Sequence, residues 1–354
     1  FVAAQFWSDI VAADDAPLLG LNYSYPYSYG NPLSSTTIKS EITAFNKTTG
    51  KATLTVKTGG TWSQSAVTSI TKVADGEYLV VGKTYNSSYT DVSMYLLIDG
   101  TTVTLAMAEE HDFPGTYTVD DKQLVIAKSG TSYTAAYDGG TAVAITPDFS
   151  ARKFMMKTAD KTYMVTWTYT TDFTFTVIEV SDEILAFVGY SSSTYITNYV
   201  TDLYDLDITF KGYDSNNKAT YTIEWEKGYN SGTVTGTLSD DGQSIVVSSQ
   251  INYNSMTIYL NKNSDNELKY VMLSTTCTAS KLMGKFTVDG KEVIIGVDAE
   301  PEYDEDDYLD GYTPRFSVTV DGVAATGVTA WDTSASSIEF TAGGTTYTAT
   351  YASG

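Results

Sequence analysis

Short segments in which apolar and polar residues alternate recur along the whole chain. The clearest have the sequences ATLTV, EYLVV, SMYLLI and TVTLAMA and lie at 52–56, 77–81, 93–98 and 102–108. Alternation with a period of two residues is typical of β-strands with one buried face. The dipeptides between such segments favour tight hairpins, as at Asp75-Gly76, Asp99-Gly100 and Gly139-Gly140. The pattern predicts antiparallel meanders and an all-β fold, in which each domain is a sandwich or a small barrel.

The two halves of the chain resemble each other. The segment GTYTVDDKQLVI at 115–126 matches GKFTVDGKEVII at 284–295. Three further matches keep the same order: 42–56 with 208–223, 75–81 with 241–247, and 162–167 with 346–351. Turn-flanked strands resemble one another in any β protein, but collinear matches at nearly constant offset are hard to obtain by chance. We therefore predict two tandem, diverged copies of one antiparallel β domain.

These matches divide the chain into four parts. We predict an N-terminal extension over 1–35, a first β domain over 36–169, a connecting segment over 170–204 and a second β domain over 205–354. An acidic insertion at 298–312 lengthens the second copy, so matching positions after it lie further apart along the chain. A chain of 354 residues is long enough for two domains that each bury a core.

The N-terminal extension has apolar residues in helical spacing. Val2, Phe6, Trp7, Ile10 and Val11 would share one face of a short helix. So short a helix is marginal in water and must dock on another surface. Two interpretations are open: the extension covers its own first domain, or it inserts into a neighbouring subunit as a helix or as an added strand. In the second case these residues contact the next subunit.

The tyrosine-rich segment at 22–32 is a second feature of the extension. Tyr23, Tyr25, Tyr27 and Tyr29 alternate in it and would lie on one side of an extended chain. Such a row of rings either covers an exposed edge of the first domain or offers a surface to sugar rings or to another protein.

Composition agrees with sheet structure and narrows the range of partners. Tyrosine occurs 28 times, and Tyr, Thr and Val suit a pleated, half-buried surface. The 43 acidic residues outnumber the 21 basic residues, for a formal net charge of −22. Nucleic acids and anionic membrane surfaces need a basic protein surface, so we expect neither as a partner. Glycans and cations are compatible with this charge.

We expect a secreted protein that acts outside the cell or on its surface. No run of about 18 apolar residues is present, so no membrane-spanning helix is predicted. The sequence begins with Phe1, as a mature product does after removal of a signal peptide. Cys277 is the single cysteine, so packing rather than an intramolecular disulfide must supply the stability. Sequons at Asn22, Asn46 and Asn86 would permit N-glycosylation.

Residues suited to catalysis are scarce. His111 is the only histidine, and its context EEHDFPG predicts a solvated loop rather than a Ser-His-Asp arrangement. Cys277 has neither a second cysteine nor a nearby histidine, which is typical of a buried, inert thiol and excludes a usual zinc site. Paired carboxylates could serve a glycoside hydrolase, but nothing in the sequence marks such a pair. We therefore expect no enzymatic activity.

The acidic insertion offers oxygen ligands of the kind that calcium prefers. Asp304, Asp306 and Asp310, followed by Gly311, loosely resemble a calcium loop but lack flanking helices and a terminal glutamate. A calcium-binding loop and a solvated acidic loop are both compatible with this pattern. Calcium is the one cofactor that the sequence suggests.

Two functions fit these observations. The first is a subunit of an extracellular fibre, sheath or surface layer that self-associates into a homopolymer through its N-terminal extension. The alternative is a carbohydrate-binding adhesin or a β-barrel that encloses a small ligand. The first predicts assembly that depends on the extension, and the second predicts an exposed aromatic row or an apolar cavity.

Overall fold

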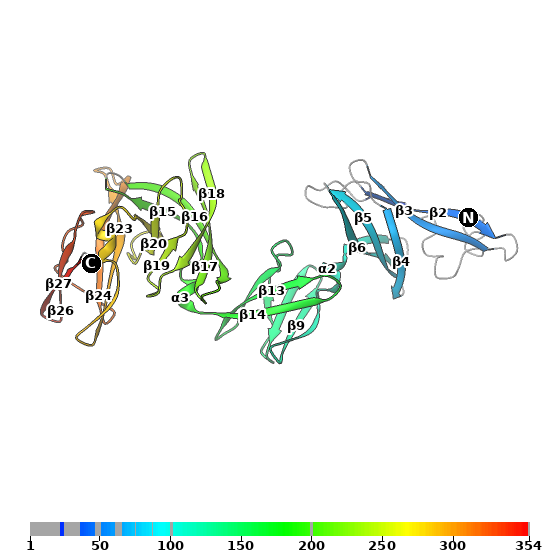
Figure 1. The fold of residues 1–354 in the computed structure, drawn as a ribbon, viewed down its shortest axis with the longest axis horizontal. Coiled ribbons are helices and arrows are strands. Elements are labelled where there is room, and N and C mark those ends of the chain that lie inside the picture. The colour runs from blue at the N-terminus through cyan, green and yellow to red at the C-terminus, as the bar shows by residue number, and fades with distance from the viewer. Residues whose placement is uncertain are drawn as a thin grey trace. The chain divides into compact units, whose positions relative to one another are not determined.

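The structure of the chain is a computed structural model. It describes the backbone of residues 22–24, 36–46, 51–60, 66–74, 76–86, 88–99, 102–198 and 201–352, and side chains mainly from residue 106 onward. The described part is nearly all β structure, which confirms the predicted all-β class. Two compact units follow each other, Phe1–Glu179 and Val180–Gly354, and each is described by itself (Figure 1).

Unit 1 begins with two antiparallel sheets. The first has the strand order β1-β2-β3 and the second the order β4-β5-β6-β7. The strands β1 to β7 comprise Asn22–Ser24, Thr36–Asn46, Lys51–Gly60, Ala66–Ala74, Glu77–Asn86, Ser88–Asp99 and Thr102–Met107. The pairing of β2 with β3 shifts register between Ile42 and Ala44, as it does at a β-bulge.

A small sandwich completes unit 1. The short helix α2 (Ala108–Asp112) precedes a sheet of order β11-β10-β9-β8, and a sheet of order β12-β13-β14 follows. The strands β8 to β14 comprise Gly115–Val119, Lys122–Ser129, Ser132–Tyr137, Val143–Ile145, Lys153–Lys157, Thr162–Tyr169 and Phe173–Val180. Leu124 and Ile126 are buried while Val125 between them is exposed, as the period-two pattern requires. Phe113 lies fully buried between the sheets and packs on Trp167.

Unit 2 begins with a closed barrel. The short helix α3 (Asp182–Leu185) precedes strands β15 to β21, which comprise Gly189–Ile196, Thr201–Tyr213, Ala219–Lys227, Asn230–Leu238, Ser244–Val247, Met256–Leu260 and Tyr270–Ser274. Neighbouring strands are antiparallel, except that β15 pairs in parallel with β21 and so closes the barrel.

Side chains fill this barrel. Residues from β16 and β17 that are at most 2% exposed are Tyr204, Leu206, Ile208, Tyr221 and Ile223. The chain around α3 closes one end, because the Tyr221 hydroxyl donates to the Ile184 carbonyl at 2.9 Å and the Tyr270 hydroxyl to the Phe187 carbonyl at 2.6 Å. Burial raises the pKa of both hydroxyls.

A second sandwich follows the barrel in unit 2. The 3-10 helix η2 (Thr278–Leu282) precedes a sheet of order β22-β23-β24-β25 and a two-stranded sheet of β26 and β27. These strands comprise Gly284–Val288, Lys291–Tyr303, Leu309–Val320, Val323–Ala324, Ser337–Ala342 and Thr345–Thr350. Val297 and Ala299 of β23 pack with Val271 and Leu273 of β21, so barrel and sandwich share a core.

The two units have the same order of elements: barrel or sheet strands, a short helix, a four-stranded sheet, and then further strands of a facing sheet. Buried residues recur at matching positions of the two copies. Before the acidic insertion these pairs are Ala108 with Cys277, Leu124 with Val293, and Ile126 with Ile295; after it they are Phe154 with Ile338, and Met156 with Phe340. These correspondences support the inferred duplication.

Two turns at matching positions of the two copies make the same hydrogen bonds. The amide and hydroxyl of Ser150 donate to Asp148 Oδ1 at 2.9 and 2.7 Å, and those of Ser334 donate to Asp332 Oδ1 at 2.8 and 2.7 Å. Hydrogen bonds of this kind lower the pKa of both carboxyl groups. The two turns are separated along the chain by the same interval as the buried pair of Phe154 and Ile338.

The sequence-based boundaries differ from the structure in two places. The predicted connecting segment at 170–204 contains β14, α3 and β15, and the units divide between Glu179 and Val180. Strand β14 falls in the predicted connection because its matching positions in the second copy would follow residue 354, so the repeat gives no match for it. The acidic insertion at 298–312 lies mostly in the paired arms of β23 and β24 rather than in a long loop.

Candidate functional site

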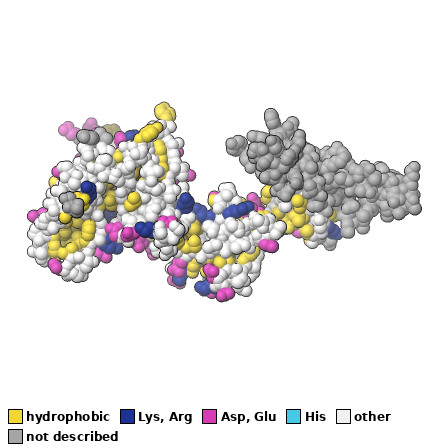
Figure 2. Space-filling model, in the orientation of Figure 1, with side chains coloured by type: hydrophobic (Ala, Val, Ile, Leu, Met, Phe, Trp, Pro, Cys, Tyr) yellow, Lys and Arg dark blue, Asp and Glu magenta, His cyan; other side chains and the backbone are white. Residues whose placement is uncertain are grey.

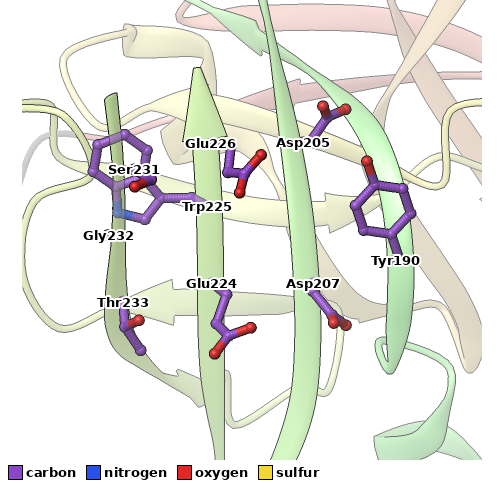
Figure 3. A pocket seen from close by; sticks show the side chains of 9 residues that line it. All are labelled: Tyr190, Asp205, Asp207, Glu224, Trp225, Glu226, Ser231, Gly232 and Thr233. Carbon is purple, nitrogen blue, oxygen red and sulfur yellow. The ribbon is translucent and has the colours of Figure 1, made fainter. Parts of the chain in front are cut away.

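Four carboxylates line the outer face of the barrel (Figure 3). In the register of β16 and β17, Asp205 lies opposite Glu226 and Asp207 lies opposite Glu224. We call these four residues the acidic face. With Tyr190 of β15 they border a shallow pocket of about 350 Å³. Like charges directly opposite each other destabilise a sheet, so this face favours a positively charged neighbour.

The acidic face changes the pKa of Tyr190, the tyrosine that borders the same pocket. The charge of Asp205, together with burial and the charges of Glu226 and Asp207, raises the pKa of the Tyr190 hydroxyl. In the described part of the chain, no group of three or more His, Cys, Asp or Glu side chains is placed to hold a metal ion. The acidic face is therefore described by its charge, which comes from four carboxylates on two neighbouring strands.

A second hollow lies at the open side of the unit 2 sandwich. This edge groove has a volume of about 460 Å³ and mainly apolar walls, which include Leu282, Phe286, Val293, Ile295, Ala349 and Tyr351. Figure 2 shows hydrophobic side chains gathered at this end of the unit, around β26 and β27. Lys281 Nζ lies 4.7 Å above the ring centre of Tyr351 and gives the groove a basic rim. An apolar groove of this kind marks an interaction surface.

In unit 1 a strand fills the corresponding place. Strand β14 adds a third strand beside β13, and its two phenylalanines turn inward. The ring of Phe175 lies 4.5 Å from that of Tyr117 and 6.1 Å from that of Trp167. The ring of Phe173 lies 5.7 Å from that of Phe113.

The residues that β14 covers correspond to residues that line the edge groove. At matching positions of the two copies, Phe113, Tyr117 and Trp167 correspond to Leu282, Phe286 and Tyr351, in that order. Within the described residues of unit 2, β27 is the last strand of its sheet and has β26 as its partner. The edge groove is thus the position that a third strand occupies in unit 1.

His111 corrects one prediction. It lies in α2 rather than in a solvated loop, and its ring stacks on Tyr95 with centroids 3.9 Å apart. Its Nδ1 is 3.2 Å from Asp112 Oδ1, and the side chain is half-buried. Helix α2 packs on the rest of the unit through Ala108, which is buried. Cys277 is fully buried as expected, and burial raises the pKa of its thiol.

The segment that resembled a calcium loop forms the β23–β24 turn, with Asp304 and Asp306, and the start of β24, with Asp310. Asp304 caps the β23–β24 turn, where its Oδ1 accepts the amides of Asp306 and Tyr308, both at 2.9 Å. Asp310 lies on β24. Asp214 makes the same pair of bonds, to the amides of Asn216 and Lys218, in the β16–β17 turn. The role of Asp304 is thus accounted for by turn closure.

Most candidates in the N-terminal extension lie outside the described residues. These are Val2, Phe6, Trp7, Ile10, Val11, Tyr25, Tyr27 and Tyr29. Tyr23 belongs to β1, where it pairs with Ile38 of β2. The sequons lie at strand ends, with Asn22 opening β1 and Asn46 and Asn86 closing β2 and β5.

Sequence reasoning missed the acidic face and the edge groove. The acidic face had a signal, because DLYDLD at 202–207 and IEWE at 223–226 alternate carboxylates with apolar residues on adjacent strands. The edge groove had no signal in the sequence, because the positions that match FTFTV at 173–177 would follow residue 354.

Comparison with protein-family models, with curated proteins and with solved structures gives no match to this chain. Among the helices that the structure describes, none is long and apolar enough to cross a membrane.

Proposed function

We propose that the protein is a non-enzymatic structural subunit of an extracellular fibre, sheath or surface layer, in which neighbouring copies are joined by strand addition. The observation that carries the proposal is the edge groove, which matches a position filled by β14 in unit 1. In this mode an incoming strand adds main-chain hydrogen bonds to β27, while its side chains enter the groove. Each aromatic or large aliphatic side chain that fills such a groove contributes about 1.5–3 kcal/mol.

The incoming strand in this proposal is the N-terminal segment of another copy. In an extended chain Val2, Ala4 and Phe6 lie on one side, which gives an apolar face of the kind that the groove requires. Residues 1–21 contain three aspartates and no lysine or arginine. The rim of the groove carries Lys281, so the charges of segment and rim are complementary.

Strand addition from copy to copy produces a homopolymer. The donor segment and the acceptor groove are different parts of the chain, so the contact is heterologous and repeats without closing on itself unless the geometry forms a ring. This property suits a fibre or layer, and it requires neither a metal nor a catalytic residue.

Disulfide trapping between two variants tests this contact. One protein carries Ala4→Cys and the other Ala349→Cys, and the two are mixed under mild oxidation; Cys277 is buried and stays unreactive. The proposal predicts a covalent dimer that contains one copy of each variant. A dimer of this kind cannot arise within one chain, since each variant carries one half of the link.

The matched control places the acceptor cysteine at Thr346, which is exposed on the same strand and does not line the groove. Much weaker trapping by Thr346→Cys supports a segment seated in the groove. Equal trapping at both positions, or none at Ala349→Cys, would contradict the proposal.

A further inference from the structure

Two hairpin turns at one end of the barrel carry exposed tyrosines. Tyr229 lies in the turn between β17 and β18, and Tyr253 lies in the turn between β19 and β20. The side chain of Tyr229 is fully exposed and that of Tyr253 is 90% exposed. Both border a groove of about 560 Å³, which we call the hairpin-tip groove. Figure 2 shows hydrophobic side chains at the tip of the β17–β18 hairpin.

The backbone at Tyr253 is unusual for so large a residue. Asn252 and Tyr253 have φ values of 48° and 66°, both in the left-handed region. A turn of this kind favours glycine at its second position. Four other described turns follow that preference, at Asp138-Gly139, Asp289-Gly290, Asp321-Gly322 and Gly343-Gly344, whereas Asp120-Asp121 has an aspartate at the second position. A strained tyrosine at an exposed tip points to a function for its ring.

The turn that carries this ring is anchored to the barrel. Ile251 and Asn254 exchange two backbone hydrogen bonds across it, at 3.0 and 2.9 Å. Asn252 Nδ2 donates to the hydroxyl of the buried Tyr204 at 3.3 Å, which fixes the turn to the barrel interior. Trp225, largely buried, lies beside the groove and supports it from the barrel side.

The chemistry of the groove is neutral. Besides its aromatic residues it is lined by Asn230, Ser231, Gln250 and Asn252, so every described residue that lines it is uncharged, in a chain with 43 acidic and 21 basic residues. Amides and a hydroxyl can both donate and accept hydrogen bonds. Flat rings beside neutral amides suit a ligand with apolar C–H faces and many hydroxyls.

We propose that the hairpin-tip groove binds a neutral saccharide. The rings of Tyr229 and Tyr253 stack on sugar faces, and the amides of Asn230, Gln250 and Asn252 bond to sugar hydroxyls. A peptide strand is a poorer occupant, because β18 is already paired on both sides with β17 and β19 and offers no free edge. This site is separate from the edge groove and does not depend on subunit assembly.

Calorimetric titration of the full chain tests the proposal. The probes are neutral hexasaccharides of β-1,4-linked glucose, β-1,3-linked glucose, α-1,4-linked glucose, β-1,4-linked mannose and β-1,4-linked xylose. We expect at least one to bind, with an affinity that does not fall as NaCl is added, since no charges take part. Binding to none of the five overturns the proposal.

Variants then locate the site. We expect Tyr229→Ala and Tyr253→Ala each to weaken binding by about fivefold or more, through loss of ring stacking. Tyr253→Gly suits the turn and keeps the hairpin folded, so its loss of affinity reports the ring alone. Tyr308→Ala removes a similarly exposed tyrosine from the β23–β24 turn and leaves affinity unchanged. Saccharide binding that survives in the Tyr229→Ala, Tyr253→Gly double variant contradicts this site.

Discussion

Glu109 joins helix α2 to the second sheet of the unit 1 sandwich. Its carboxylate accepts two hydrogen bonds from Arg152, at 2.9 and 3.0 Å, and one from the indole of Trp167 at 2.8 Å. Trp167 is buried, so its N–H depends on this acceptor. The neighbouring Glu110 is exposed and makes no such contact within the described residues.

Replacing Glu109 should destabilise unit 1. We expect Glu109→Ala to lower the free energy of unfolding by about 2 kcal/mol, because a buried donor loses its partner along with a charge-assisted pair. Urea unfolding followed by tryptophan fluorescence measures the change. Glu110→Ala is the control and should shift the free energy by less than about 0.5 kcal/mol. Equal effects of the two substitutions would show that the network contributes nothing.

Tyr253 should stabilise the fold when it is replaced by glycine. Its left-handed backbone is strained for a side chain with a Cβ atom, and relief of that strain is worth about 1 kcal/mol. Tyr229→Gly is the matched control, since the positive φ in that turn belongs to Gly228. We expect a higher urea midpoint for Tyr253→Gly and no gain for Tyr229→Gly. A loss of stability in Tyr253→Gly would refute the argument from strain.

Strand β14 is the third strand of its sheet in unit 1, whereas the described facing sheet of unit 2 has the two strands β26 and β27. Its Phe175 is buried among Tyr117, Phe113 and Trp167, whereas Phe286, which lines the edge groove, is 43% exposed. We expect Phe175→Ala to cost about 3–5 kcal/mol in the free energy of unfolding and Phe286→Ala less than about 1 kcal/mol. Chemical unfolding of the two variants checks this. Similar costs would mean that the edge groove is already filled.

The hairpins are the most predictable elements. Alternation and turn dipeptides locate the β8–β9 and β22–β23 hairpins, and the matching positions of their buried residues follow from the same pattern. The repeat-based division leaves β14 in the connecting segment although FTFTV alternates, because the matching positions would follow residue 354 and offer no second copy for comparison. From its charge, the acidic insertion is expected to form a loop. In the structure most of it belongs to the paired strands β23 and β24, where Asp298 lies opposite Arg315. The composition of this segment shows that it is acidic, but it does not show that its residues pair with a neighbouring strand.

At the scale of the whole molecule, buried tyrosines should make the fold sensitive to alkali. Burial raises the pKa of Tyr95 and Tyr117 to about 12, from an ordinary value of 10.0. In the unfolded chain these hydroxyls ionise near 10, so their contribution to stability is complete below pH 10 and is lost as the pH rises from 10 toward 12.

A pH titration followed by tyrosinate absorbance and circular dichroism checks this expectation. Exposed tyrosines should ionise near pH 10 while the β signal persists, and the remaining phenols should ionise only as that signal is lost. If every tyrosine ionises near pH 10 with the β signal intact, the assigned burial is wrong.

The arrangement of whole sheets could not be derived from the sequence. Alternation specifies sandwich and barrel equally, and unit 2 contains both, with β15 and β21 closing the barrel through a parallel pair that no local pattern indicates. The two grooves depend on this arrangement. The edge groove requires two sheets of unequal strand number, and the hairpin-tip groove requires two turns, at Tyr229 and Tyr253, that meet at one barrel end.

Light scattering over a range of protein concentrations tests most directly whether copies join through the edge groove. The samples are the full chain, a chain that lacks residues 1–21, and the full chain with Ala349→Phe, which fills the groove, or with Thr346→Phe as its control. We expect polymers for the full chain and Thr346→Phe, and monomers for the truncated chain and Ala349→Phe. A full chain that stays monomeric throughout, or an Ala349→Phe variant that assembles as well as Thr346→Phe, would contradict it.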